Sequence, residues 1–133
     1  MKTGVLLFRI TAIVVFIQLA LGGLLTFDFI NATPHIITGF VVFALAIATM
    51  VFAFIGKPRF RPVQMISIGL VVLLLIQIIL GFATLSSGSS VVAWIHLVNA
   101  LAIYGMAVAG TFLAIQWNRM PISQVEQANV RKA

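Results

Sequence analysis

The pattern Q-x-x-L-G occurs twice in this chain, as Gln18-Leu19-Ala20-Leu21-Gly22 and as Gln77-Ile78-Ile79-Leu80-Gly81. Each copy lies in a long apolar run, and after a short polar break a histidine follows near the start of the next apolar run. These histidines are His35 and His96, and the chain has no other. The two glutamines are 59 residues apart and the two histidines 61, so the sequence predicts a repeat whose unit is one helical hairpin.

The composition is that of an integral membrane protein. Of the 133 residues, 62% are hydrophobic and only 8% are charged, and the mean hydropathy is +1.22. A soluble domain has about 25% charged residues, whereas a membrane span needs about 20 apolar residues in a row. The sequence predicts an all-α, up-down bundle of four transmembrane helices built from two repeated hairpins. We expect one domain over residues 1–117, with spans at about 5–27, 35–55, 63–84 and 91–117, and a polar cytoplasmic tail over 118–133.

The charged residues predict the orientation in the membrane. If the four spans alternate in direction, one side of the membrane receives no cation and carries Asp28. Cytoplasmic segments are enriched in lysine and arginine, so we expect a multi-pass protein of the plasma membrane with both termini cytoplasmic and the histidines facing outward. This placement explains the net charge of +6 without a nucleic-acid partner. The other side receives all eight cations: Lys2, Arg9, Lys57, Arg59, Arg61, Arg119, Arg131 and Lys132.

The absence of cysteine limits the chemistry. Without a thiol the chain cannot form disulfides, thiolate metal sites, iron–sulfur clusters or a covalent haem attachment through C-x-x-C-H. Two histidines alone also supply too few ligands for a closed zinc or copper site.

The two histidines have the spacing that a haem would need. Spans 2 and 4 run in the same direction and are diagonal partners in an up-down bundle. Neighbouring helices pack ~8–10 Å apart, so the diagonal is roughly 14 Å. That gap is too wide for direct contact between imidazoles and suits imidazole, iron and imidazole in line. We therefore predict that His35 and His96 are the metal ligands of one haem; the other interpretation is that both are interfacial residues.

Small and amide side chains accompany the histidines. Gly39 and Ala100 lie four residues after His35 and His96, on the same helix face, where they leave room for a flat macrocycle; close helix packing would explain small residues as well. Gln18 and Gln77 lie deeper, and an amide in hydrocarbon needs a partner. One interpretation is a hydrogen bond between spans 1 and 3; the other is a contact with the far edge of the porphyrin.

The order of these motifs resembles the haem A synthase family. The resemblance rests on Gln77–Leu85, the Ser/Gly loop and Trp94-Ile95-His96-Leu97, and on Gln18–Gly23 followed by His35, and it covers residues 5–117. In that family each half of an eight-span protein is a four-helix bundle, with a histidine at the outer start of its second and fourth helices. The resemblance implies that His35 and His96 ligate a haem, which we expect to be haem B, with haem O and haem A as alternatives.

Two departures from the family bear on catalysis. The family's catalytic half has a glutamate three residues before the first histidine and an arginine directly after it, where this chain has Ala32 and Ile36. Many members also have a cysteine pair that this chain lacks. The chain is therefore more similar to the cofactor-carrying half, and enzyme activity is left open. Asp28 is the only acid on the outer side that could replace the glutamate.

Three functions fit these observations to different degrees. The first is a haem protein of the haem A synthase type in respiratory oxidase haem biogenesis, in which a homodimer would restore eight helices. The second is a b-type cytochrome that exchanges electrons with quinol, or an accessory subunit of a respiratory oxidase, because two histidines close both axial positions. The third is a small multidrug transporter, which would need an acidic residue at mid-membrane depth; the spans contain none.

Overall fold

The computed structural model describes residues 2–56, 59–121, 123–124 and 130. Over these ranges it contains four long helices: α1 (Lys2–Thr26), α2 (Ala32–Ile55), α3 (Arg61–Ser87) and α4 (Ser90–Arg119). Each is long and apolar enough to cross a membrane. The predicted four-helix membrane bundle is confirmed, and the helix ends differ from the predicted spans by three residues or fewer.

Local sequence explains where the helices begin and end. The Asn31 side chain caps α2 by accepting a hydrogen bond of 3.0 Å from the backbone N–H of Thr33. Gly88 ends α3 in the left-handed conformation, with φ of 61°, which costs glycine little. Asp28 takes φ of 60° in the turn between α1 and α2, and aspartate is among the few other residues that adopt this conformation.

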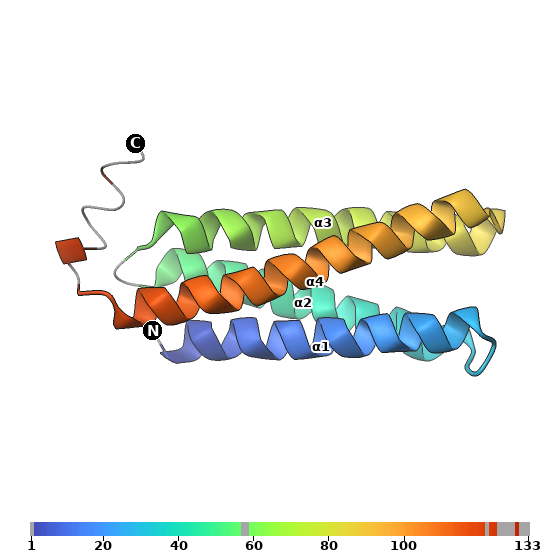
Figure 1. The fold of residues 1–133 in the computed structure, drawn as a ribbon, viewed down its shortest axis with the longest axis horizontal. Helices are drawn as coiled ribbons and strands as arrows, with labels where there is room; N and C mark the ends of the chain where they lie inside the picture. Colours follow the sequence, from blue (N-terminus) through green and yellow to red (C-terminus); the bar gives the residue numbers. More distant parts are fainter. Residues whose placement is uncertain (1, 57–58, 122, 125–129, 131–133) are drawn as a thin grey trace.

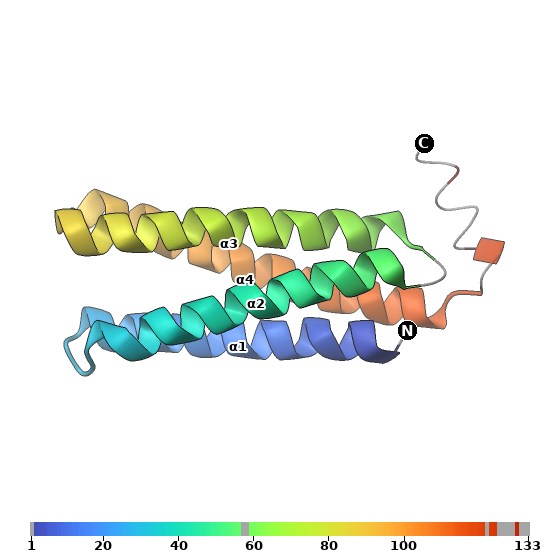
Figure 2. The same ribbon diagram turned by 180° about the vertical axis from the view of Figure 1, so that it is seen from behind.

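The helices form a square in which α1 and α3 each pack against both α2 and α4. As predicted from the up-down topology, α2 and α4 are therefore diagonal partners. Both cross the bundle obliquely, so the hairpins α1/α2 and α3/α4 separate toward the end that holds their turns (Figures 1 and 2). At the other end, α1 lies beside α4 and α2 lies beside α3.

Burial divides the bundle into two halves. We call residues 16–41 and 75–102 the histidine half and the described residues on either side of them the packed half. Every residue of the histidine half is described, and none of them is buried. All buried residues lie in the packed half: Phe8, Thr11, Val15, Val42, Ala46, Thr49, Ala53, Phe60, Val63, Ser67, Leu70, Leu74, Ile103, Ala107, Gly110, Ala114 and Trp117.

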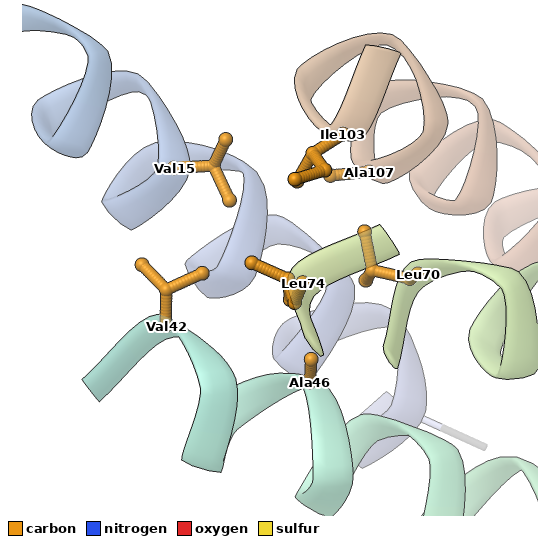
Figure 3. Packing of buried hydrophobic residues seen from close by; sticks show 7 residues of the cluster. All are labelled: Val15, Val42, Ala46, Leu70, Leu74, Ile103 and Ala107. Carbon is orange, nitrogen blue, oxygen red and sulfur yellow. The ribbon is translucent and has the colours of Figure 1, made fainter. Parts of the chain in front are cut away.

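The packed half contains two apolar clusters. One lies near the chain termini and is built around Phe8 and Trp117. The other lies at the middle of the bundle, where all four helices contribute side chains that point toward the axis: Val15, Val42, Ala46, Leu70, Leu74, Ile103 and Ala107 (Figure 3). Because lipid is as apolar as these side chains, close packing rather than removal from water holds the helices together here.

The polar residues of the packed half are paired locally. The hydroxyl groups of Thr11 and Thr49 are 3.2 Å apart and join α1 to α2. Ser67 donates to the carbonyl of Gln64 within α3. Part of the predicted tail, at 122, 125–129 and 131–133, lies outside the described residues, as does Lys57.

Candidate cofactor site

The two histidines meet in the histidine half. His35 begins the second turn of α2 and His96 lies in the second turn of α4. Their ring centroids are 6.1 Å apart, and the ring planes make an angle of 64°. The expectation that the diagonal gap is too wide for direct contact between the imidazoles was wrong, because the estimate of roughly 14 Å refers to helix axes. Side chains reaching inward from both helices close most of that distance, so the two imidazoles come within reach of one ligand.

A cavity of about 530 Å³ surrounds the histidines. This volume lies in the range of about 300–1,000 Å³ that small-molecule and cofactor sites occupy. The floor consists of one apolar side chain from each helix: Val15, Val42, Leu74 and Ile103. Figure 3 shows these four among the residues of the central cluster, so the cavity begins where the packed half ends.

The lining of the cavity is mostly apolar with a few polar groups. All six residues predicted for the site line the cavity: Gln18, His35, Gly39, Gln77, His96 and Ala100. Trp94 and Thr84 line it as well, whereas Asp28, in the turn that precedes α2, does not belong to the lining.

In the first hairpin, Gln18 and Gly22 together hold the ring of His35. The amide nitrogen of Gln18 donates to the backbone carbonyl of His35 at 2.8 Å and lies 3.4 Å from its Nε2. One turn further along α1, a Cβ on Gly22 would lie 3.1 Å from Cε1 of the same ring. A Cβ on Gly39 would lie 3.1 Å from the Gln18 amide nitrogen. The glycines thus make room for an imidazole and an amide that pack directly on the helix backbones.

The second hairpin repeats this arrangement with one addition. The amide nitrogen of Gln77 lies 3.1 Å from Nε2 of His96, and a Cβ on Gly81 would lie 3.2 Å from Cε1 of that ring. Here the Gln77 oxygen also accepts a hydrogen bond of 2.7 Å from the amide of Asn99. Asn99 in turn donates to the carbonyl of Leu73 at 3.1 Å. The Q-x-x-L-G pattern is therefore a cradle for the histidine of the next helix.

These contacts correct the interpretation that Gln18 and Gln77 bond to each other between spans 1 and 3. Both amides bond to a histidine within their own hairpin. The physical reason is distance, because α1 and α3 are diagonal, whereas each histidine lies on a neighbouring helix. Asn99, three residues after His96, is a further hydrogen-bonding member of the site. An amide in an apolar helix was the available signal, since such a group needs a partner.

Three buried side-chain atoms in the described residues have no hydrogen-bond partner, and all belong to this constellation. They are Oε1 of Gln18, Nδ1 of His35 and Nδ1 of His96. Buried polar atoms are nearly always paired, so unpaired ones indicate strain or a functional role. Their concentration around one cavity distinguishes this region from the rest of the described chain.

The residues present fit a haem held by two histidines. A bond between a metal and an imidazole nitrogen is about 2 Å long, so two rings on opposite sides of one metal have centroids about 6 Å apart. The observed separation of 6.1 Å agrees with this value. The described residues contain no cluster of three or more His, Cys, Asp or Glu side chains that could enclose a metal ion by themselves. A macrocycle supplies the remaining ligands in a haem.

Comparison of the chain with protein-family models, curated proteins and solved structures finds no match.

Proposed function

We propose that this membrane protein binds one haem between the two hairpins, and that His35 and His96 would hold its iron. The observation that supports this proposal most directly is the meeting of the two imidazoles, 6.1 Å apart, at the wall of a cavity in the otherwise loosely packed half of the bundle. Haem B is the expected cofactor, with haem O and haem A as alternatives. When bound, the iron supplies one-electron chemistry.

The chain's own residues have three tasks in this proposal. His35 and His96 supply one ring nitrogen each to the metal. Gly22 and Gly81 allow the rings to lie against α1 and α3. The apolar lining excludes water and favours a flat apolar ligand over a hydrated ion.

Part of the proposal concerns orientation. Arg59, Arg61 and Arg119 lie at the end of the bundle opposite the histidines, and Arg9 lies toward the same end. Because cytoplasmic ends of spans are enriched in such residues, we propose that both termini face the cytoplasm of a plasma-membrane protein. The haem then lies near the outer surface.

The resemblance to haem A synthases supports a role in haem biogenesis for a respiratory oxidase, alone or as a homodimer. One observation favours the alternative, a b-type cytochrome that transfers electrons from quinol or serves as an oxidase subunit. Ala32 lines the cavity at the position of the family's glutamate, and Asp28 is not among the lining residues. The described lining contains no acid that could replace that glutamate. Two histidine ligands would suit electron transfer by a bound haem.

The decisive measurement is the optical spectrum of the detergent-purified protein, oxidised and reduced, with pyridine haemochrome analysis. Stoichiometric haem B with a sharp reduced α-band would support the proposal and favour the cytochrome. Haem O or haem A would favour the synthase type.

Single variants test the ligands. His35→Ala and His96→Ala should each lower haem content while the protein still inserts in the membrane. A protein that stays colourless after haem is offered would contradict the proposal, as would two variants with full haem content and an unchanged spectrum.

A further inference from the structure

The two halves of the site repeat in sequence but differ in their hydrogen bonds. From this difference we infer that the two axial ligands are unequal: His35 is the ligand that stays bound, and His96 is the ligand that a small uncharged molecule displaces. The inference rests on the proposed haem site and assigns Gln77 and Asn99 as positioning residues that act through His96.

The first step concerns the proton on each imidazole. An amide nitrogen can only donate, so Nε2 of His35 and Nε2 of His96 both accept from a glutamine. A neutral imidazole has one donor and one acceptor nitrogen, so the proton of each ring is on Nδ1. The lone pair available for iron is therefore the one on Nε2, and binding iron would break the contact between Nε2 and the glutamine N–H.

In the second hairpin this exchange is opposed by a fixed chain of hydrogen bonds. The Leu73 carbonyl can only accept, so the NH₂ group of Asn99 must face it. The same NH₂ group donates to Oε1 of Gln77 at 2.7 Å, which directs the Gln77 NH₂ group toward His96. Among the described residues, the contact of 3.1 Å with Nε2 is the only hydrogen bond of this NH₂ group. Binding of iron by His96 leaves that donor without its partner.

In the first hairpin the exchange costs less. The Gln18 NH₂ group makes its short contact, 2.8 Å, with the backbone carbonyl of His35 and a longer one, 3.4 Å, with the ring. When iron takes Nε2, the bond to the carbonyl remains. The residue at the position equivalent to Asn99 is Thr38, whose hydroxyl donates to the carbonyl of Pro34. Oε1 of Gln18 therefore has no partner that fixes the orientation of its amide. Breaking the contact between Nε2 and the glutamine therefore costs less for His35 than for His96.

Carbon monoxide is a suitable probe because it binds ferrous haem by replacing one axial nitrogen, without oxidation or reduction. The experiment measures the CO dissociation constant of the reduced haem protein, by optical titration, for wild type, Gln77→Leu, Asn99→Leu and Gln18→Leu. Gln18→Leu is the matched control, because it removes the same amide from the other hairpin.

We expect Gln77→Leu and Asn99→Leu to raise the CO dissociation constant about fivefold. This is the change in an equilibrium constant that the loss of one ordinary hydrogen bond causes. His96 then competes better for the iron. Gln18→Leu should change the constant less than about twofold. Asn99→Leu keeps the experiment informative if Gln77→Leu does not fold. His35→Ala should also lower haem affinity more than His96→Ala.

The outcomes separate this inference from the proposed function. A wild-type protein that takes up no haem contradicts the proposed function and the inference together. A stoichiometric haem protein overturns the inference alone if it binds no CO, or if Gln18→Leu changes CO binding as much as Gln77→Leu and Asn99→Leu do.

Discussion

The rings of His35 and His96 lie 6.1 Å apart although the two residues are 61 positions apart in the chain and belong to diagonal helices. They join the two hairpins in the half of the bundle where no residue is buried. The contact depends on how the rings are held from behind, by Gln18 and Gly22 in one hairpin and by Gln77 and Gly81 in the other. Substitutions of Gly22 and Gly81 should therefore affect the site without touching the histidines.

Gly22→Ala and Gly81→Ala should each lower haem affinity by about tenfold, the lower range for changes to residues that support metal ligands. A Cβ at these positions would lie 3.1 and 3.2 Å from Cε1 of His35 and His96, so the ring must turn or shift. Haem affinity is measured by optical titration of the purified variants.

Gly105→Ala is the control for this prediction. It adds the same methyl group to α4, outside the cavity lining, where a Cβ meets nothing within 4 Å. Haem affinity should be unchanged. Equal losses in Gly22→Ala and Gly105→Ala would mean that the glycines act through helix flexibility and not through the space beside the ring.

Gly110→Ala should destabilise the packed half by about 1–3 kcal/mol, the usual cost of an extra methyl group in a full core. A Cβ at Gly110 would overlap the ring of Phe8, which is 1% exposed. The readout is the thermal unfolding midpoint in detergent. Gly105→Ala, on the same helix with nothing within 4 Å, should leave the midpoint unchanged, and Phe8→Leu should partly restore the stability of Gly110→Ala.

The hydrogen bond between Thr11 and Thr49 should contribute modestly to stability. Both side chains are buried, and their oxygens are 3.2 Å apart. Hydrogen bonds between membrane helices average about 0.6 kcal/mol. A double-mutant cycle with Thr11→Val, Thr49→Val and the double variant should give a coupling energy of about that size. A coupling energy of zero would show that the hydroxyls are satisfied by their own helices, as the bond from Thr49 to the carbonyl of Leu45 permits.

The orientation can be tested directly because the chain contains no cysteine. Ser86→Cys lies at the histidine end, and Gln124→Cys lies beyond α4 at the other end; both positions are exposed. In intact cells, a thiol reagent that cannot cross the membrane should label Ser86→Cys only. Labelling of Gln124→Cys alone would reverse the proposed orientation, and the wild-type chain provides the background.

The sequence predicted the four helices and their arrangement because these depend on properties of single segments. Apolar runs of about 20 residues give the spans, and the up-down topology makes α2 and α4 diagonal. The breaks around Asp28 and Gly88 were also visible, as short polar segments between the apolar runs. The convergence of His35 and His96 then followed from bundle geometry.

The partners of Gln18 and Gln77 were not predictable in the same way. A glutamine side chain reaches several atoms on more than one neighbouring helix, and which atom it contacts depends on helix rotation and crossing angle. The role of Asn99 depends on the same angles, because its amide must reach both Gln77 and Leu73 on α3. The separation of the two hairpins in the histidine half also arises from the oblique paths of α2 and α4, which no hydropathy pattern specifies (Figures 1 and 2).

All buried residues of the described chain lie in one half of the bundle. The two hairpins are therefore packed firmly together at one end and loosely at the other. A small rotation of one hairpin about the firmly packed end changes the gap at the other end without removing a buried side chain from its neighbours. The thickness and edge substituents of a bound haem would then set the final gap between the two hairpins. In the proposed haem site, one backbone would thus accommodate flat molecules of different outline, and side chains at the rim would select among them.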